Sequence, residues 1–134
     1  MFLTSAISHG NDIEIGNNAP EIETTEGINV VADANSNEKS KVISFWSPKQ
    51  PSSRISNRNL SALYGQNDSD YEFISICTDG DEDLMKEVMK IDGINPARNL
   101  AYSAVSPRVF KDYGVENQPR AFVISPEGKI TDIL

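Results

Sequence analysis

The chain has 134 residues and a mass of 14.7 kDa, which suits a single domain with one hydrophobic core. Hydrophobic residues make up 38% of it, but no apolar run approaches the roughly 18 residues of a membrane-spanning helix, so the sequence predicts no membrane span. A net charge of −8 and a pI near 4.5 argue against nucleic acid or an anionic membrane as partner, because phosphate binding needs clustered Lys and Arg.

Residues 1–12 are predicted to precede the domain, which we place at residues 13–134. The segment from Met1 to His9 ends in small residues, as a trimmed signal peptide does, but it lacks a basic leader and a full apolar segment. The sequence therefore leaves open whether residues 1–12 are an N-terminal tail or a signal-peptide remnant.

A hairpin is the first predicted element of the domain. Residues 13–25 read I-E-I-G-N-N-A-P-E-I-E-T-T, and Glu26-Gly27 supply turn residues directly after them. Residues 28–31 are predicted as a short strand, and the polar run over residues 33–41 as a loop with no identifiable chemistry.

Residues 42–54 read V-I-S-F-W-S-P-K-Q-P-S-S-R and predict a strand, a loop and a helix start. The apolar run up to Trp46 indicates a strand in a sheet that is covered on both faces. A helix is expected over residues 52–64, with Gly65 closing it in the left-handed conformation. Its apolar residues are Ile55, Leu60, Ala62 and Leu63, and its amphipathicity is weak.

Residues 71–77 predict a central strand that ends at Cys77, the only cysteine in the sequence. Alternation places Phe73, Ser75 and Cys77 on one face of this strand. A free cysteine in such a strand is usually a small hydrophobic core residue, and Cys77 has no second cysteine to resolve a disulfide. An inert, buried Cys77 is therefore the favoured interpretation, and a redox or nucleophilic Cys77 is the alternative.

An acidic run over residues 79–83 precedes a predicted helix. Asp79, Asp81 and Asp83 match the first three ligand positions of a calcium loop. However, Leu84 stands at the position that needs Gly, and Lys90 stands at that of the bidentate Glu. We therefore predict helix capping here, and neither a metal ion nor another cofactor. The apolar residues at helical spacing are Leu84, Met85, Val88, Met89 and Ile91.

A short helix is predicted after Ser106, whose hydroxyl would cap it, with Pro107 at the first helical position. Val109, Phe110 and Tyr113 would form its buried face.

The last motif covers residues 113–130, which read Y-G-V-E-N-Q-P-R-A-F-V-I-S-P-E-G-K-I. Its end predicts a hairpin loop over residues 125–129, with Gly128 in the left-handed conformation.

These segments resemble the thioredoxin-like thiol-disulfide oxidoreductases related to TlpA and the AhpC/TSA type. Residues 42–54 align without a gap on the family motif F-W-A-x-W-C-x-x-C-K/R, and residues 113–130 on Y-G-V-x-x-x-P-x-x-F-x-I-D-x-x-G-K-I. Residues 13–25 resemble the family's G-x-x-A-P-x-F segment. The resemblance implies an α/β fold, a thioredoxin-like three-layer sandwich with a mixed central sheet and an added N-terminal hairpin.

Both cysteines of the family motif are replaced in this chain, by Gln50 and by Ser53. The Gln50 amide cannot ionise or attack, and the Ser53 hydroxyl needs a strong neighbouring base to become a nucleophile. Ser44 stands where many relatives carry a buried Asp that helps to move protons. The Thr-x-x-Cys segment of peroxiredoxins is also missing. The resemblance therefore implies a degenerate active site without catalytic residues.

The leading hypothesis is a redox-inactive domain that binds a protein or peptide in the former active-site groove. In the family the conserved proline is cis and faces the cysteine pair, which implies a cis Gln118-Pro119 bond beside Gln50. The backbone beside Pro119 would then pair with an extended peptide. The residues assigned to the groove are Trp46 and Pro51, which shape it, Gln50 and Ser53, which offer hydrogen bonds, and Gln118 and Pro119.

Two alternatives stay open: an oxidoreductase or related redoxin that acts through Cys77 or an atypical route, and a structural or assembly module. The sequence ends at Leu134, before the final helix of the family, so one face of the sheet is expected to lack its cover. A homodimer could form through that face. The resemblance weakly favours the bacterial periplasm or another extracytoplasmic compartment.

Overall fold

The computed structural model describes residues 13–32 and 39–134, which form a mixed sheet with helices on both faces. The strand order is β3-β2-β1-β4-β5, in which β1, β2 and β3 are parallel while β4 and β5 are antiparallel to their neighbours. The predicted α/β sandwich is therefore confirmed. The strands are β1 (Ser40–Trp46), β2 (Tyr71–Cys77), β3 (Asn99–Leu100), β4 (Ala121–Ile124) and β5 (Ile130–Ile133).

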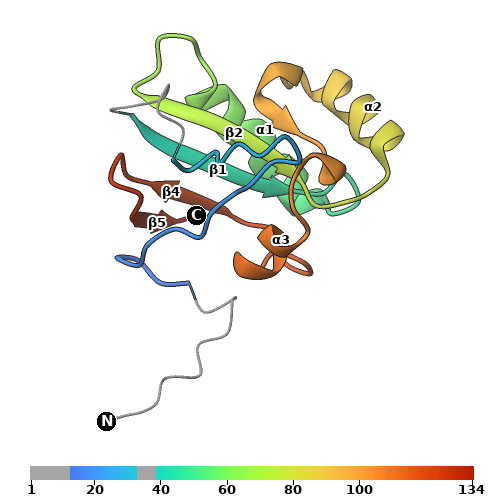
Figure 1. Cartoon of the computed structure of the whole chain (residues 1–134). Helices are drawn as coiled ribbons and strands as arrows, with labels where there is room; N and C mark the ends of the chain where they lie inside the picture. Colours follow the sequence, from blue (N-terminus) through green and yellow to red (C-terminus); the bar gives the residue numbers. More distant parts are fainter. Residues whose placement is uncertain (1–12, 33–38) are drawn as a thin grey trace.

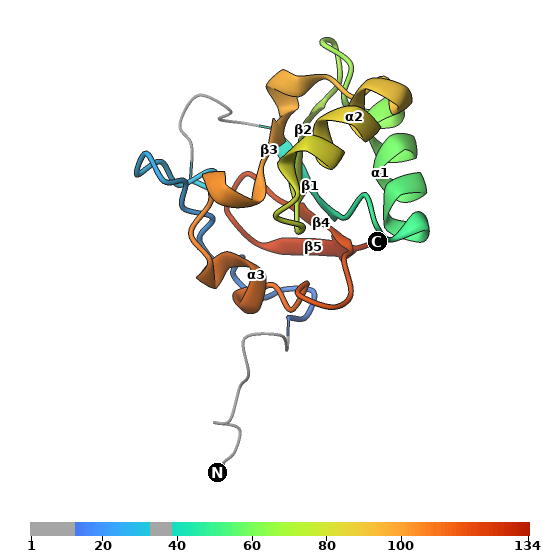
Figure 2. The same ribbon diagram turned by 90° about the vertical axis from the view of Figure 1, so that its right-hand side faces the viewer.

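Three α-helices of the described chain complete the layers: α1 (Pro51–Tyr64), α2 (Glu82–Asp92) and α3 (Arg108–Asp112). Helices α1 and α2 lie on one side of the sheet, and α3 lies on the other with the N-terminal segment (Figures 1 and 2). Two short 3-10 helices, η2 (Pro96–Arg98) and η3 (Tyr102–Ala104), flank β3.

Strand β1 is buried on both faces, as its apolar run predicts. Ile43 and Phe45 join the larger core cluster with Phe110 of α3, and Trp46 joins a second cluster with Met85 of α2. The sheet thus separates two core clusters. Strand β1 ends between them, and the loop of residues 47–50 leads from it into α1.

Helix α1 differs most from its prediction. Its buried residues are Ser53 and Asn57, whereas Ile55 is 50% and Leu63 67% exposed. Gly65 has a φ of −84°, so the predicted left-handed end is wrong. A glycine is still favoured there, because its N–H reaches the Ser61 carbonyl at 2.8 Å and a Cβ would lie 2.5 Å from that oxygen.

Helix α2 has the predicted capping. Asp81 Oδ1 accepts a hydrogen bond from the Leu84 N–H at 3.1 Å, and Glu82 and Asp83 occupy the first turn, where negative charge stabilises a helix. Met85, Val88 and Met89 are buried, while Ile91 is 70% exposed. Within the described ranges, no group of three or more His, Cys, Asp and Glu side chains could hold a metal ion.

The start of α3 corrects another expectation. Pro107 is the capping residue rather than the first helical residue, and the helix begins at Arg108. Ser106 contributes its backbone carbonyl, which accepts from the Val109 N–H at 3.0 Å, and no side chain caps the helix. The prediction failed because Pro107 already has helical dihedral angles (φ −56°, ψ −29°) and directs the Ser106 carbonyl toward the first turn. The predicted burial of Val109, Phe110 and Tyr113 is confirmed.

The N-terminal hairpin is confirmed in a reduced form. Gly27 turns the chain with a φ of 86°, and the Thr24 N–H donates to the Ile28 carbonyl at 2.8 Å. The strand predicted over residues 28–31 is only an isolated bridge at Asn29. The Asn29 side chain explains this, because its Oδ1 accepts from the N–H groups of Ile22 (3.2 Å) and Val31 (3.1 Å) in place of a longer ladder.

The loop between β4 and β5 is the predicted hairpin turn. Gly128 has a φ of 86°, and the Ser125 N–H donates to the Lys129 carbonyl at 2.8 Å.

The two faces of the outer strands differ in what covers them. On one face, Ile22 and Val30 of the N-terminal segment pack in the cluster that holds Ile124 and Ile130. On the other face no described helix lies over β5, which presents the exposed Asp132 there beside the half-buried Val123. The homodimer through this face stays a prediction.

Within residues 13–32 and 39–134, no helix has both the length and the apolar character to cross a membrane.

Candidate functional site

The loop that follows β1 lies beside the turn that precedes β4. The register between these strands pairs Ser44 with Ala121, and the Phe45 N–H donates to the Arg120 carbonyl at 3.1 Å. Continuing this register places Pro119 opposite Trp46, at the end of the strand from which the loop leaves. The structure therefore brings the two motif segments together at one end of the sheet.

The peptide bond between Gln118 and Pro119 is trans, so the predicted cis bond is wrong. The trans form is the intrinsically favoured one for a bond to proline, by about 0.5–1 kcal/mol. The pairing of Phe45 with Arg120 is made from this trans geometry, so entry into β4 does not need the cis isomer.

Ser53 ties the loop together from inside. Its side chain is 7% exposed, and its Oγ accepts a hydrogen bond from the Ser47 N–H at 3.0 Å. The same Oγ lies 2.9 Å from the Gln50 carbonyl and 3.2 Å from the Ser47 carbonyl, to which it can donate. The single hydroxyl proton is used within the loop, so the structure places Ser53 beneath the surface of the predicted site.

The other residues predicted for the site differ in exposure: some reach the surface, and Trp46 is buried beneath it. Gln50 is half-buried and Pro51 is exposed, while Gln118 is exposed and Pro119 half-buried. Trp46 is 1% exposed, and its Nε1 donates to the Asn99 side-chain oxygen at 3.0 Å. Trp46 therefore supports the loop from below.

Asp92 is a residue of this region that sequence reasoning missed. Its carboxylate is 4% exposed and makes two hydrogen bonds with Arg54 of α1, from Nε at 2.8 Å and from Nη2 at 2.9 Å. These hydrogen bonds hold the pKa of Asp92 below its ordinary value. No local pattern pairs two residues that are 38 positions apart, although Arg54 itself belongs to the family motif.

A cavity of about 180 Å³ opens beside the loop. Pro48, Pro51 and Ile55 give it apolar walls, while Arg54, Arg58 and Asp92 give it charge. Arg54 is neutralised by Asp92, whereas Arg58 makes no ion pair with a described residue. The cavity therefore has apolar walls and a net charge of +1, which comes from Arg58.

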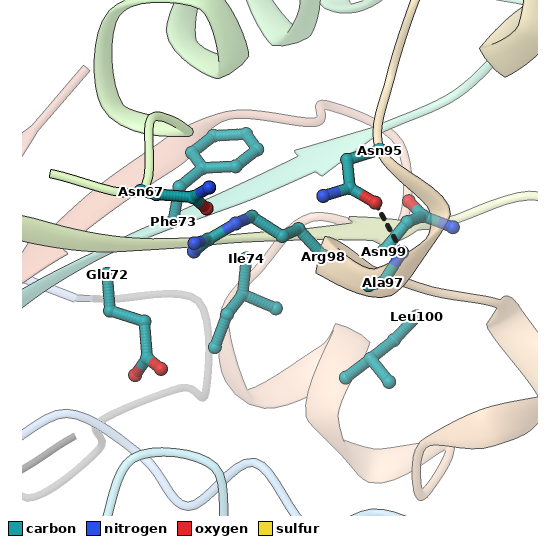
Figure 3. Close-up of a pocket in the computed structure, with 9 residues that line it drawn as sticks. All are labelled: Asn67, Glu72, Phe73, Ile74, Asn95, Ala97, Arg98, Asn99 and Leu100. Atoms are coloured by element: carbon teal, nitrogen blue, oxygen red, sulfur yellow. Dashed lines mark hydrogen bonds between the residues drawn. The ribbon is translucent and has the colours of Figure 1, made fainter. Parts of the chain in front are cut away.

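A larger cavity, of about 470 Å³, lies at the β2–β3 edge of the sheet and away from the predicted site (Figure 3). Strand β3 pairs only with Ser75 and Ile76, so the first residues of β2 have no described strand on that side. Figure 3 shows the Arg98 side chain extending along β2 there. A charged side chain of this kind discourages further strands from pairing with an open edge.

Cys77 lies at the end of β2, fully buried, with its Sγ 3.4 Å from the Asp79 carbonyl. Burial raises the pKa of the Cys77 thiol to about 11. Since the thiolate is the reactive form, the raised pKa and the burial both disfavour reaction of this thiol at neutral pH.

Comparison with known proteins identifies the fold. No protein-family model and no curated protein matches the sequence. A thioredoxin-like protein from Parabacteroides distasonis matches the structure with a TM-score of 0.72 and 22% identity, over 90% of this chain and 87% of that one. The chain has the thioredoxin-like fold.

Other solved structures with the thioredoxin-like fold are thiol-disulfide oxidoreductases. The thioredoxin domain of one from Bacteroides vulgatus matches with a TM-score of 0.70 and 19% identity, over 91% of this chain and 89% of that one. A secreted disulfide oxidoreductase from Mycobacterium tuberculosis, homologous to E. coli DsbE, matches with a TM-score of 0.60 and 24% identity, over 84% and 80%. This chain has a single cysteine, at the end of β2, which fits the loss of the redox motif.

Proposed function

We propose that this chain is a redox-inactive thioredoxin-like domain that binds a protein or an extended peptide at the loop of residues 47–53 and the neighbouring Gln118-Pro119 turn. The observation that carries the proposal is the Ser53 hydroxyl, which makes its bonds to Ser47 and Gln50 inside the loop. A loop held in shape without a reactive group supports a binding role, because a preorganised surface loses little entropy on association.

The surface above Ser53 offers groups that suit an extended peptide. Within the described chain, neither the N–H nor the C=O of Gln118 has a hydrogen-bond partner, so both can pair with a peptide backbone. The half-buried Gln50 side chain lies at the start of α1 and can donate or accept. Pro51 follows Gln50 in the chain, is exposed, and adds apolar surface as one of the residues that line the cavity beside α1.

The cavity beside the loop supports a particular partner chemistry. A volume of about 180 Å³ with walls of Pro48, Pro51 and Ile55 suits one apolar side chain, and Arg58 suits a carboxylate next to it. Helix α1 carries two arginines and no acidic residue, although the whole chain has a net charge of −8. An extended segment with an apolar residue beside an acidic one is therefore the proposed ligand.

Peptide selection tests the proposal directly. Peptides selected from a random displayed library against the folded chain should be enriched in neighbouring apolar and acidic residues. Their dissociation constants, measured by fluorescence anisotropy, should rise at least about fivefold in Gln50→Ala and Arg58→Gln. Lys111→Gln in α3 is the matched control and should leave them unchanged. Selection of no peptide, or of peptides that bind both site variants as well as the native chain, would contradict the proposal.

We also propose an extracytoplasmic location, which the similarity to a secreted oxidoreductase supports. Fractionation of cells that express the native gene with a C-terminal tag would check it, with recovery in the cytoplasmic fraction as the contrary result.

A further inference from the structure

A third cavity, of about 600 Å³, lies between α2 and the chain that returns through η2 to β3. These segments run side by side at the outer end of the sheet (Figures 1 and 2). Its volume falls within the roughly 300–1,000 Å³ typical of small-molecule sites. It shares no residue with the peptide site proposed above, so it requires an explanation of its own.

The floor of this cavity is apolar and adaptable. Met85, Met89 and Ile94 line it, and they belong to the core cluster that contains Trp46. Methionine side chains are flexible and polarisable, so they can pack against chains of differing shape.

Asn99, the polar side chain at the floor, already forms hydrogen bonds with neighbouring residues. Its Oδ1 accepts from Trp46 Nε1 at 3.0 Å and from Ser75 Oγ at 2.7 Å, and its Nδ2 donates to Met85 Sδ at 3.4 Å. A ligand in this cavity therefore meets mainly hydrocarbon and thioether groups on its buried side, since the Asn99 side chain already bonds to Trp46, Ser75 and Met85.

The rim of the cavity is charged. Lys86 and Lys90 are one helical turn apart on α2, and Glu82 is one turn before Lys86. Neither lysine forms a salt bridge with a described residue. Two lysines and one glutamate leave a net charge of +1, which attracts an anionic group and disfavours cations.

We infer that this cavity binds a small amphipathic carboxylate, with an unbranched aliphatic chain against Met85, Met89 and Ile94 and its carboxylate at Lys86 and Lys90. The aliphatic chain gains the free energy of leaving water, and the lysines select the charge of the head group.

Titration with sodium octanoate and sodium decanoate, below their micelle concentrations, tests the inference on the full chain. Trp46 is the only tryptophan and shares its core cluster with the cavity floor, so its fluorescence should change saturably. Decanoate should bind about tenfold more tightly than octanoate, because each buried methylene adds roughly threefold to fourfold. Amide chemical shifts should move in α2 and residues 93–101. No saturable binding of decanoate, or shifts confined to another region, would overturn the inference.

Charge and shape controls complete the experiment. The double variant Lys86→Gln with Lys90→Gln should bind decanoate about tenfold more weakly, while Lys111→Gln with Lys129→Gln should not differ from the native chain. Decyltrimethylammonium should not bind. Ala101→Leu, which fills part of the cavity, should weaken decanoate binding without lowering the thermal midpoint. Equal binding of the cationic and anionic detergents, or of native and lysine-substituted chains, would overturn the inference.

Discussion

The Ser53 side chain holds the loop of residues 47–53 together, at a position where the resembling oxidoreductases carry a cysteine. Its three short contacts to Ser47 and Gln50 are made at a position that is 7% exposed, so Ser53→Ala leaves the buried Ser47 N–H without a partner. We expect a loss of about 1–3 kcal/mol in the free energy of unfolding, measured by urea denaturation. Ser52→Ala, at the exposed neighbouring position, is the matched control and should change little. Equal effects of the two substitutions would contradict this role of Ser53.

Asn57 shows the opposite situation, a buried group that weakens the fold. It is 1% exposed, and its Oδ1 has no hydrogen-bond partner among residues 13–32 and 39–134. Asn57→Leu removes the unsatisfied oxygen and buries apolar surface, so it should raise the free energy of unfolding by about 1–2 kcal/mol. Asn59→Leu, at an exposed position of the same helix, controls for helix propensity and should give only a few tenths of that. Destabilisation by Asn57→Leu would show that the amide has a partner in solution.

The raised pKa of Cys77 predicts how the stability of the fold changes at alkaline pH. The folded thiol has a pKa of about 11, against an ordinary value of 9.0, so the unfolded chain releases this proton first as the pH rises. The contribution of Cys77 to stability is therefore complete below pH 9 and is lost as the pH approaches 11. Stability measured over this range should fall more steeply for the native chain than for Cys77→Ser. Rapid modification of folded Cys77 by a thiol reagent at pH 7 would contradict its burial.

The Arg54–Asp92 ion pair joins helices α1 and α2, and the stability that it contributes depends on pH. The hydrogen bonds from Arg54 lower the pKa of Asp92, so the unfolded chain takes up this proton first as the pH falls. The stabilisation is present above about pH 4, the range where an unperturbed Asp is ionised, and is lost below it. Asp92→Asn should lower stability at pH 6 and flatten its decline between pH 4 and pH 2. Glu87→Gln, an exposed substitution on α2, should follow the native profile.

The elements that the sequence predicted well are those with a strong pattern. The apolar runs of β1 and β2 and the capped, periodic α2 were predicted at nearly their observed bounds. Helix α1 could be located only from the family motif, because it buries Ser53 and Asn57 and exposes Ile55. Strand β3 has only two residues, which is too short for any periodicity to be recognised.

The arrangement of the site could be predicted from sequence only in part. The two motif segments placed the 47–53 loop and the Pro119 turn together, as the β1–β4 register shows. The trans bond at Pro119, the inward hydroxyl of Ser53 and the Asp92 partner of Arg54 all depend on tertiary contacts. Residue identity showed which cysteines of the family motif this chain lacks, and only the packing showed which side chains reach the surface.

The whole molecule has the thioredoxin-like fold, and the redox inactivity that we propose for it rests on two positions. Gln50 occupies the N-cap position of α1, without a side-chain capping bond, where the helix dipole would stabilise a thiolate. Ser53 follows one helical turn later, and its Oγ lies 2.9 Å from the Gln50 carbonyl. We therefore expect a cysteine pair at these two positions to regain redox activity.

Insulin reduction by dithiothreitol, followed by turbidity, tests this attribution most directly. The native chain should give no acceleration, and the double variant Gln50→Cys with Ser53→Cys should form a disulfide and accelerate the reaction. Turnover by the native chain that disappears in Cys77→Ser, or a folded double variant without activity, would contradict the account.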